Sequence, residues 1–152
     1  MDQTNGLILM AYSSVATRHF DRANLVELLA FARNHNETHG LTGMLLYVDE
    51  SFFQILEGDP EQLHALYGRI EQDTRHSKVI KLLEVPIEKR SFSRWSMGYA
   101  KVTREELANI PGLNDFFGKG LAFTELGEGK AKVLLDAFRE GKWRRRLGRD
   151  AS

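Results

Sequence analysis

Apolar runs separated by polar breaks predict an alternation of strands and helices along most of the chain. Residues 7–12 form a short apolar run that stops at Ser13 and Ser14, which indicates a buried strand leading into a loop. Asp21 is the expected N-cap of a helix that extends to about Asn36, because its carboxylate can accept hydrogen bonds from the first turn. The positions that recur at helical spacing are Leu25, Leu28, Leu29 and Ala32.

A hairpin and a second helix are predicted next. Residues 44–48 and 51–57 are apolar segments separated by two acidic residues, a pattern typical of paired strands. Asp59 is the expected N-cap of the helix, and Pro60 occupies its first position, where the missing N–H has no hydrogen bond to lose. The apolar stripe of this helix is expected at Leu63, Leu66, Tyr67 and Ile70.

The order of these segments predicts an α+β fold of the ferredoxin-like kind. Residues 79–85, stopped by Pro86, and residues 95–102 predict a fourth and a fifth strand. The resulting βαββαβ order is the split βαβ arrangement, here with one added strand. Both helices then lie on one face of the sheet, and a bare apolar face opposite them would aggregate. We therefore expect short C-terminal helices to cover the other face, at residues 104–109, 115–117 and 130–139.

Composition indicates one folded domain and agrees with a reducing compartment. The chain has 152 residues, of which 42% are apolar and 28% charged, enough to build a single core. It contains no cysteine, which excludes disulfides, thiolate nucleophiles and cysteine-ligated metal centres. Neither an export signal nor a run of about 20 apolar residues is visible, so we expect a cytoplasmic protein without a membrane span.

The net charge of zero hides an asymmetry between the two ends of the chain. Residues 130–152 carry eight Lys or Arg against three acids, a net charge of +5, and the remaining residues therefore carry −5. The acidic body makes nucleic acid an unlikely partner for the core. The basic tail, residues 139–149, could instead engage an acidic protein, a nucleic acid or an anionic membrane, or be a solvated chain end.

Common catalytic patterns do not occur, but polar side chains do stand inside the apolar strands. The chain has no P-loop, no GxSxG and no HExxH, and its five histidines are not at metal-ligand spacing, so neither an enzyme nor a metal site is expected. Strand alternation places Gln54 on one face with Phe52 and Leu56. A buried carboxamide needs partners there, because leaving it unpaired costs about 1–3 kcal/mol. Taken alone, Gln54 could equally face solvent or bond to neighbouring backbone.

Four segments taken together resemble the BLUF family, the flavin-based blue-light sensors. Tyr12 closes the first strand, Asn36 stands before Gly-Leu-Thr-Gly at 40–43, and Gln54 lies in Phe-Phe-Gln-Ile-Leu-Glu-Gly at 52–58. The fourth segment is Arg-Trp-Ser-Met at 94–97. Singly, each of these residues is explained by packing or helix capping. In order and spacing together they resemble the family over residues 7–102.

The resemblance implies a flavin held non-covalently between the two helices, roughly perpendicular to the sheet. FAD is the expected flavin, and FMN or riboflavin also fit. Tyr12 matches the photochemical tyrosine, Gln54 the glutamine at flavin N5 and the C4 carbonyl, and Asn36 the asparagine at the pyrimidine end. Trp95 and Met97 match a pair thought to exchange places in light. The other expected flavin-binding residues are His35, Asp73, Arg75 and His76 among the polar ones, and Leu28 and Phe52 among the apolar ones.

The function implied is that of a photoreceptor and not of an enzyme. Electron and proton transfer from Tyr12 through Gln54 would rearrange the hydrogen bonds to the flavin and shift its absorption to the red. The signal would leave a sensor core, residues 1–102, through the fifth strand and a helical extension, residues 103–152. With no room for an effector domain after Val102, we expect a separate protein partner and, by analogy, a homo-oligomer.

Two other classes stay open at this point. A flavin oxidoreductase would need a hydride source, and the sequence has no dinucleotide fingerprint. A ferredoxin-like interaction module without flavin could stack RNA bases on exposed aromatic residues such as Tyr47, Phe52 and Phe53. The acidic body argues against the second class.

Overall fold

The computed structural model describes residues 6–17, 21–48, 50–74, 76–92, 98–100, 103–113, 116 and 123–139. The elements in these ranges are β1 (Ile8–Ala16), α1 (Arg22–His39), β2 (Thr42–Val48), β3 (Ser51–Gly58), α2 (Pro60–Gln72), β4 (His76–Pro86), β5 (Gly98–Ala100), α3 (Arg104–Ala108), η2 (Phe123–Glu125) and α5 (Glu128–Arg139). None of the helices in these ranges combines the length and the apolar character that crossing a bilayer requires.

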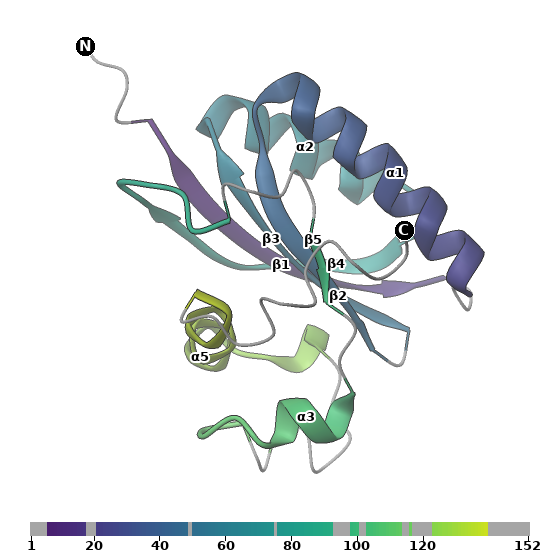
Figure 1. Ribbon diagram of the computed structural model, residues 1–152, viewed down its shortest axis with the longest axis vertical. Helices are drawn as coiled ribbons and strands as arrows, with labels where there is room; N and C mark the ends of the chain where they lie inside the picture. Colours follow the sequence, from purple (N-terminus) through teal and green to yellow (C-terminus); the bar gives the residue numbers. More distant parts are fainter. Residues whose placement is uncertain are drawn as a thin grey trace.

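The strands form one sheet in the order β4-β1-β3-β2-β5. Neighbouring strands are antiparallel, except that β5 runs parallel to β2. Helices α1 and α2 lie on one face, and α3 and α5 lie on the other (Figure 1). The α+β ferredoxin-like fold predicted from the order of the segments, with its added strand and its C-terminal cover, is therefore confirmed.

Alternation along the strands divides the core into two clusters, one on each face of the sheet. Met10 and Tyr12 of β1 and Leu56 of β3 point toward α1 and α2. Their sequence neighbours point the other way and pack against the C-terminal elements. The cover of that second face is built from Leu107, Ile110, Leu113, Phe116, Phe123, Leu126, Ala131, Leu134 and Leu135. The C-terminal elements thus supply half of a core that the sheet could not bury alone.

The starts of the helices agree with the residues expected there. The Asp21 side chain accepts a hydrogen bond from Asn24 N at 2.8 Å, and Asp21 N donates to Asn24 Oδ1 at 3.2 Å, which makes a capping box. Asp59 caps α2 with a bond from Gln62 N at 3.2 Å, and Pro60 is the first helical residue. These polar caps satisfy N–H groups that the helix itself leaves without acceptors.

Several boundaries differ from the prediction, most of all those of β1, α1 and β4. β1 does not end at Tyr12 but continues through Ser13 and Ser14 to Ala16, because both neighbouring strands keep pairing with it. α1 continues past Asn36 to His39, and its C-cap is Gly40, with φ 70° in the left-handed region that favours glycine. β4 begins at His76, three residues early. The described part of the predicted fifth strand is Gly98–Ala100, and of residues 115–117 only Phe116 is described.

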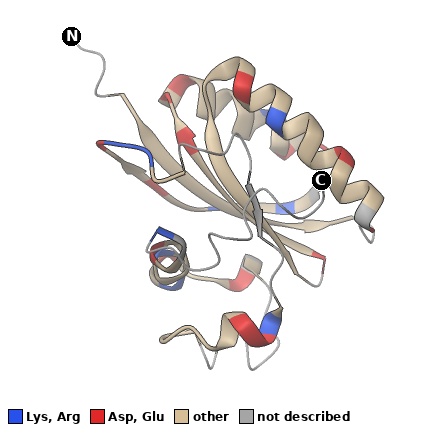
Figure 2. Ribbon diagram, in the orientation of Figure 1, with Lys and Arg blue, Asp and Glu red and all other residues tan. Residues whose placement is uncertain are grey.

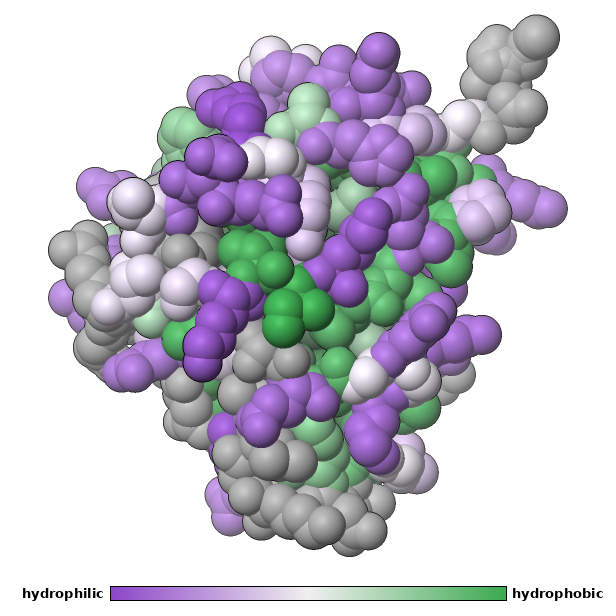
Figure 3. Space-filling model, turned by 180° about the vertical axis from the view of Figure 1, so that it is seen from behind, coloured by the Kyte–Doolittle hydropathy of each residue, from purple (hydrophilic) through white to green (hydrophobic). Residues whose placement is uncertain are grey.

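Charged and apolar side chains are mixed over the surface. Acidic and basic positions both occur on α5 and are scattered over the other elements (Figure 2). On the side turned away in Figure 1, apolar side chains reach the surface between polar ones (Figure 3). Among the described residues, the exposed large apolar side chains are Phe31 on α1 and Ile80 on the edge strand β4, at 54% and 40%.

Gly43 in β2 occupies a position where the neighbouring backbone leaves no room for a side chain. A Cβ atom there would overlap the carbonyl oxygen of Ile55 in β3. We expect Gly43→Ala to lower the free energy of unfolding by about 1–3 kcal/mol, as overpacking in a core does. Gly129→Ala is the control, since a Cβ at that α5 position meets nothing within 4 Å and is expected to be neutral or stabilising. Urea denaturation of both variants measures the difference, and equal midpoints would contradict it.

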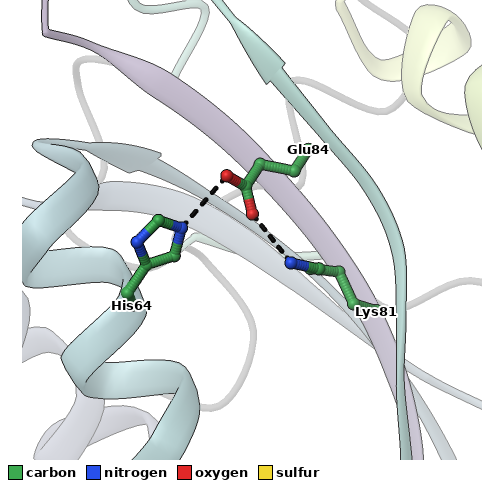
Figure 4. A network of polar contacts seen from close by, with 3 residues as sticks. All are labelled: His64, Lys81 and Glu84. Atoms are coloured by element: carbon green, nitrogen blue, oxygen red, sulfur yellow. Dashed lines mark hydrogen bonds and ion pairs between the residues drawn. The ribbon is translucent and has the colours of Figure 1, made fainter.

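A small polar network joins α2 to the edge strand β4 (Figure 4). Glu84 accepts from Lys81 Nζ at 2.9 Å and lies 3.0 Å from His64 Nε2. These hydrogen bonds, first that of Lys81 and then that of His64, lower the pKa of Glu84. Folding therefore favours the charged form of Glu84. The stability that this carboxylate contributes is lost as the pH falls below about 4.3, the ordinary pKa of a glutamate side chain.

The pH dependence of this network gives a second prediction. Because the partners are solvent-exposed, we expect Glu84→Gln to lower the free energy of unfolding by less than about 1 kcal/mol at pH 7. The difference from the wild-type protein should shrink as the pH falls below about 4.3. Urea denaturation at several pH values tests this, with Glu88→Gln, an exposed carboxylate in the next loop, as control. If the difference in the free energy of unfolding between Glu84→Gln and the wild-type protein grows toward low pH, the prediction is contradicted.

Candidate functional site

A cavity of about 520 Å³ lies between α1 and α2, above the middle of the sheet. Its floor comes from β1, β2 and β3, and its walls come from the facing sides of the two helices. The lining residues are Tyr12, Leu28, Leu29, Phe31, Ala32, His35, Asn36, Leu45, Gln54, Ala65, Leu66, Gly68, Arg69, Ile70, Gln72 and Asp73. A mostly apolar hollow with a few convergent polar groups is typical of a binding site for a small molecule or cofactor.

Tyr12 and Gln54 stand side by side on the floor. They face each other directly in the register of β1 and β3, so their side chains share the face toward the helices. Tyr12 is 1% exposed. Burial, followed by the effects of Tyr67 and Asp73, raises the pKa of Tyr12 above its ordinary value of about 10. The phenol therefore keeps its proton at neutral and moderately alkaline pH.

Tyr67 of α2 supports the Tyr12 ring from the side. The two ring centroids are 5.6 Å apart and the planes meet at 72°, an edge-to-face contact. Lys81 Nζ lies 6.0 Å from the centre of the Tyr67 ring. The position of the floor tyrosine is thus set by an aromatic side chain of the neighbouring helix.

The polar end of the cavity is formed by the last turns of α1 and by Arg69. The Asn36 side chain is buried, and its Oδ1 lies 3.4 Å from Nδ1 of His35. Arg69 Nη1 of α2 lies 3.4 Å from Nε2 of the same imidazole, which also stacks on His39. Burial, with smaller contributions from His39 and Arg69, lowers the pKa of His35 although its bond to Asn36 opposes the shift. His35 is therefore mainly neutral at pH 7.

The apolar walls leave a slot between the helices. Leu28, Leu29 and Ala32 come from α1, and Leu66 and Ile70 come from α2. Gly68 lies between these α2 residues, and a Cβ atom there would meet nothing within 4 Å. The missing side chain keeps the α2 wall open, so that a flat group can enter between apolar faces.

A family model described as "Sensors of blue-light using FAD" matches residues 7–98 of this chain. The chain belongs to the BLUF family. It is 36% identical over 122 residues to a photoactivated adenylate cyclase subunit beta of Euglena longa, and 38% identical over 111 residues to a subunit alpha of Euglena gracilis. These matches cover 79% and 72% of this chain but only 14% and 11% of the relatives.

Two solved structures match the chain over most of their own length. The ground state of BlsA superposes with a TM-score of 0.74 at 28% identity, over 88% of this chain and 87% of that one. The dark state of BlrB, a BLUF protein, gives 0.65 at 28% identity, over 90% and 98%. The function predicted from the sequence, that of a BLUF blue-light flavin sensor, is confirmed at this level.

Within this BLUF domain, the structure brings most of the predicted site residues to one cavity. Tyr12, Leu28, His35, Asn36, Gln54 and Asp73 all line it. Phe52 belongs to the same apolar cluster as Tyr12 but does not line the cavity, and its ring packs against Tyr47 with centroids 4.8 Å apart. Arg75, Trp95 and Met97, and the side chain of His76, lie outside the described residues. Their assignment stays a prediction.

Sequence reasoning missed two residues that line the BLUF cavity, Gly68 and Arg69, and one that supports its floor, Tyr67. Tyr67 was assigned to an apolar stripe, and helical spacing cannot show that its ring meets Tyr12 of another element. Arg69 follows two positions later on the exposed side of that stripe, and Gly68 has no periodic signal at all. A glycine inside an otherwise regular helix was the available sign, since it weakens the helix and usually has a packing reason.

Proposed function

We propose that this BLUF domain binds FAD non-covalently in the α1–α2 cavity and converts blue light into a new hydrogen-bond arrangement of Tyr12 and Gln54. The observation that carries the proposal is the direct pairing of these two residues on the cavity floor. One is a phenol that holds its proton, and the other is a side chain that both donates and accepts. The family description supports FAD as the flavin.

The residues of the cavity fit a flavin. Its volume of about 520 Å³ falls within the range of about 300–1,000 Å³ found for ligand pockets. Leu28 and Ala32 on one wall and Leu66 and Ile70 on the other offer apolar surfaces to the two faces of a flat ring. Asn36, with neutral His35 beside it, offers an amide to the polar edge of the ring. With no cysteine in the chain, a thioether link to the protein is excluded.

The bound flavin supplies absorption of blue light and, once excited, a strong tendency to accept an electron. Tyr12 is placed to give that electron together with its phenolic proton. Gln54 is placed to pass the proton on, and rotation of its carboxamide exchanges donor and acceptor. A new donor directed at a ring carbonyl favours the charge distribution of the excited state, which shifts absorption to the red. One such rearrangement is worth about 0.5–1.5 kcal/mol, which limits the bias it can exert on the rest of the domain.

The signal is proposed to leave through the strand beside β2. Trp95 and Met97 precede β5, which pairs with β2 next to Leu45 of the cavity floor. We infer that residues 1–102 act as the sensor core and residues 103–152 as the helical extension that carries the change outward. We propose further that this domain is a sensor without catalytic activity, that it forms a homo-oligomer, and that it passes its signal to a separate protein partner. The curated relatives of this chain are named as photoactivated adenylate cyclase subunits, so an adenylate cyclase is the first class of partner to test.

A difference spectrum tests the proposal. The purified protein should be yellow, release FAD on denaturation, and show a small red shift under blue light that reverses in the dark. Bleaching driven by NAD(P)H would instead indicate an oxidoreductase. A colourless protein that cannot be reconstituted with FAD, FMN or riboflavin would contradict a flavin sensor.

A further inference from the structure

A polar cluster with a buried carboxylate at its centre joins the ends of β2 and β3 to the last turn of α1. We define it as the Glu57 cluster, and its members are Gly40, Thr42, Glu57, Arg90, Ser91 and Arg139. Its centre is the carboxylate of Glu57, a residue with 0% exposure at the end of β3. Charged side chains are almost never fully buried unless they are paired, so this one needs a reason.

Glu57 and Arg90 clamp residues 90–92 onto the ends of β2 and β3. The Glu57 carboxylate accepts from Ser91 N at 2.6 Å and from Phe92 N at 3.0 Å. It also accepts from Thr42 Oγ1 at 3.0 Å, and Arg90 Nη1 donates to that same Thr42 oxygen at 2.9 Å. Charge-assisted bonds of this kind are stronger than neutral ones and fix direction as well as distance. Residues 90–92 are thus held in place at the ends of β2 and β3.

The cluster also reaches the wall of the cavity. Arg90 Nη2 donates to the carbonyl oxygen of Gly40 at 2.7 Å. Gly40 is the C-cap of α1, and its N–H donates to the carbonyl oxygen of Asn36, whose side chain lines the cavity. Leu41 N donates to the same oxygen at 2.8 Å. The last turn of α1 is therefore bonded to Arg90 as well as to the cavity.

On the other side, the cluster holds the end of α5. Arg139 Nε donates to Ser91 Oγ at 3.2 Å, and Arg139 is the last residue of that helix. Ser91 therefore binds Glu57 through its backbone and α5 through its side chain. A continuous set of contacts runs from Asn36 through Gly40, Arg90 and Ser91 to Arg139. It crosses from the face that carries the cavity to the opposite face, where α5 lies (Figure 1).

We propose that the Glu57 cluster couples the cavity to α5, with Glu57 and Arg90 as positioning residues for residues 90–92 and the Ser91–Arg139 bond as the contact to α5. The proposal rests on the proposed function, since it supplies the path by which the light-induced change leaves the sensor core. A rearrangement in the cavity can move residues 90–92 only by disturbing the clamp. Any such movement changes the distance between Ser91 Oγ and Arg139.

Amide hydrogen exchange of α5 in the full chain loaded with FAD tests the coupling. In wild-type protein we expect α5 to exchange faster in light than in darkness. Ser91→Ala removes the acceptor but keeps the backbone N–H that binds Glu57. Its red shift should stay unchanged, and its light-to-dark exchange ratio should fall by about threefold to tenfold, the equivalent of one hydrogen bond. Lys132→Ala, an exposed change on α5, should keep the wild-type ratio.

Two further variants separate coupling from simple loss of structure. Arg139→Gln combined with Ser91→Ala should add nothing to either single change, because both remove the same bond. Glu57→Gln keeps the shape of the side chain but replaces one of its two accepting oxygens by a donating NH2 group, so one bond to Ser91, Phe92 or Thr42 is lost. Its red shift should remain, and its α5 ratio should fall as in Ser91→Ala. Asp136→Asn tests the neighbouring pair, in which Arg139 Nη1 lies 3.9 Å from Asp136, and should leave the ratio unchanged.

The outcomes distinguish the two proposals. A normal red shift with no light–dark difference in α5, or with an undiminished difference in Ser91→Ala, overturns the coupling and leaves the proposed function standing. Loss of the red shift itself in Ser91→Ala shows that the cluster acts on the cavity and not on α5, which also overturns it. Wild-type protein without any red shift overturns the proposed function and the coupling with it.

Discussion

Replacing Gln54 by leucine is expected to abolish the light-induced red shift while the protein keeps its flavin. The two side chains have similar volumes, so the floor of the cavity stays filled. The leucine has no group that can pass on a proton or offer a new hydrogen bond to the ring. Since Gln54 faces Tyr12 in the β1–β3 register, no other described side chain stands in the same place. The shift should therefore vanish entirely.

The measurement is the dark-minus-light absorption spectrum at a matched flavin content. Gln62→Leu makes the same chemical change on α2 at a position that does not line the cavity, and it should keep the full shift. A wild-type shift in Gln54→Leu would remove Gln54 from the mechanism.

Local patterns were sufficient for the framework of the domain. The alternation at residues 52–56 placed Phe52, Gln54 and Leu56 on one face, and the structure puts Gln54 in the cavity of that face. Asp21, Asp59 and Pro60 located both helix starts, because caps act within one turn. These features depend on residues that are close together in the sequence, so they can be predicted from a single sequence.

Long-range polar contacts could not be predicted in the same way. The polar character of Ser13 and Ser14 predicts a loop, yet two flanking strands bury both residues. Arg90 binds the carbonyl oxygen of Gly40 across fifty residues, and Glu57 is buried because the backbone of Ser91 and Phe92 happens to meet it. The periodic pattern of apolar residues along a helix or strand does not predict such partners. The flavin-site residues were found through their combined resemblance to a family, since each one alone is explained by packing.

Replacing Tyr12 by phenylalanine is expected to stop the forward photoreaction without emptying the cavity. Phenylalanine keeps the ring that meets Tyr67 at 5.6 Å, so the floor and its support remain. The variant loses the phenolic proton, and an unsubstituted ring is a much poorer electron donor. We expect the yield of the red-shifted state to fall on the order of 100-fold or more, the range for removing a positioned proton donor.

The matched control for this experiment is Tyr67→Phe. It removes a phenolic hydroxyl from the neighbouring ring, which lies next to Lys81 and does not itself line the cavity. If Tyr12 is the donor, Tyr67→Phe keeps a complete photocycle with at most a changed rate, whereas Tyr12→Phe shows none under the same illumination. A full photocycle in Tyr12→Phe would mean that another side chain, with Trp95 the first to test, gives the electron. In that case the pairing of Tyr12 with Gln54 would position the glutamine and not start the reaction.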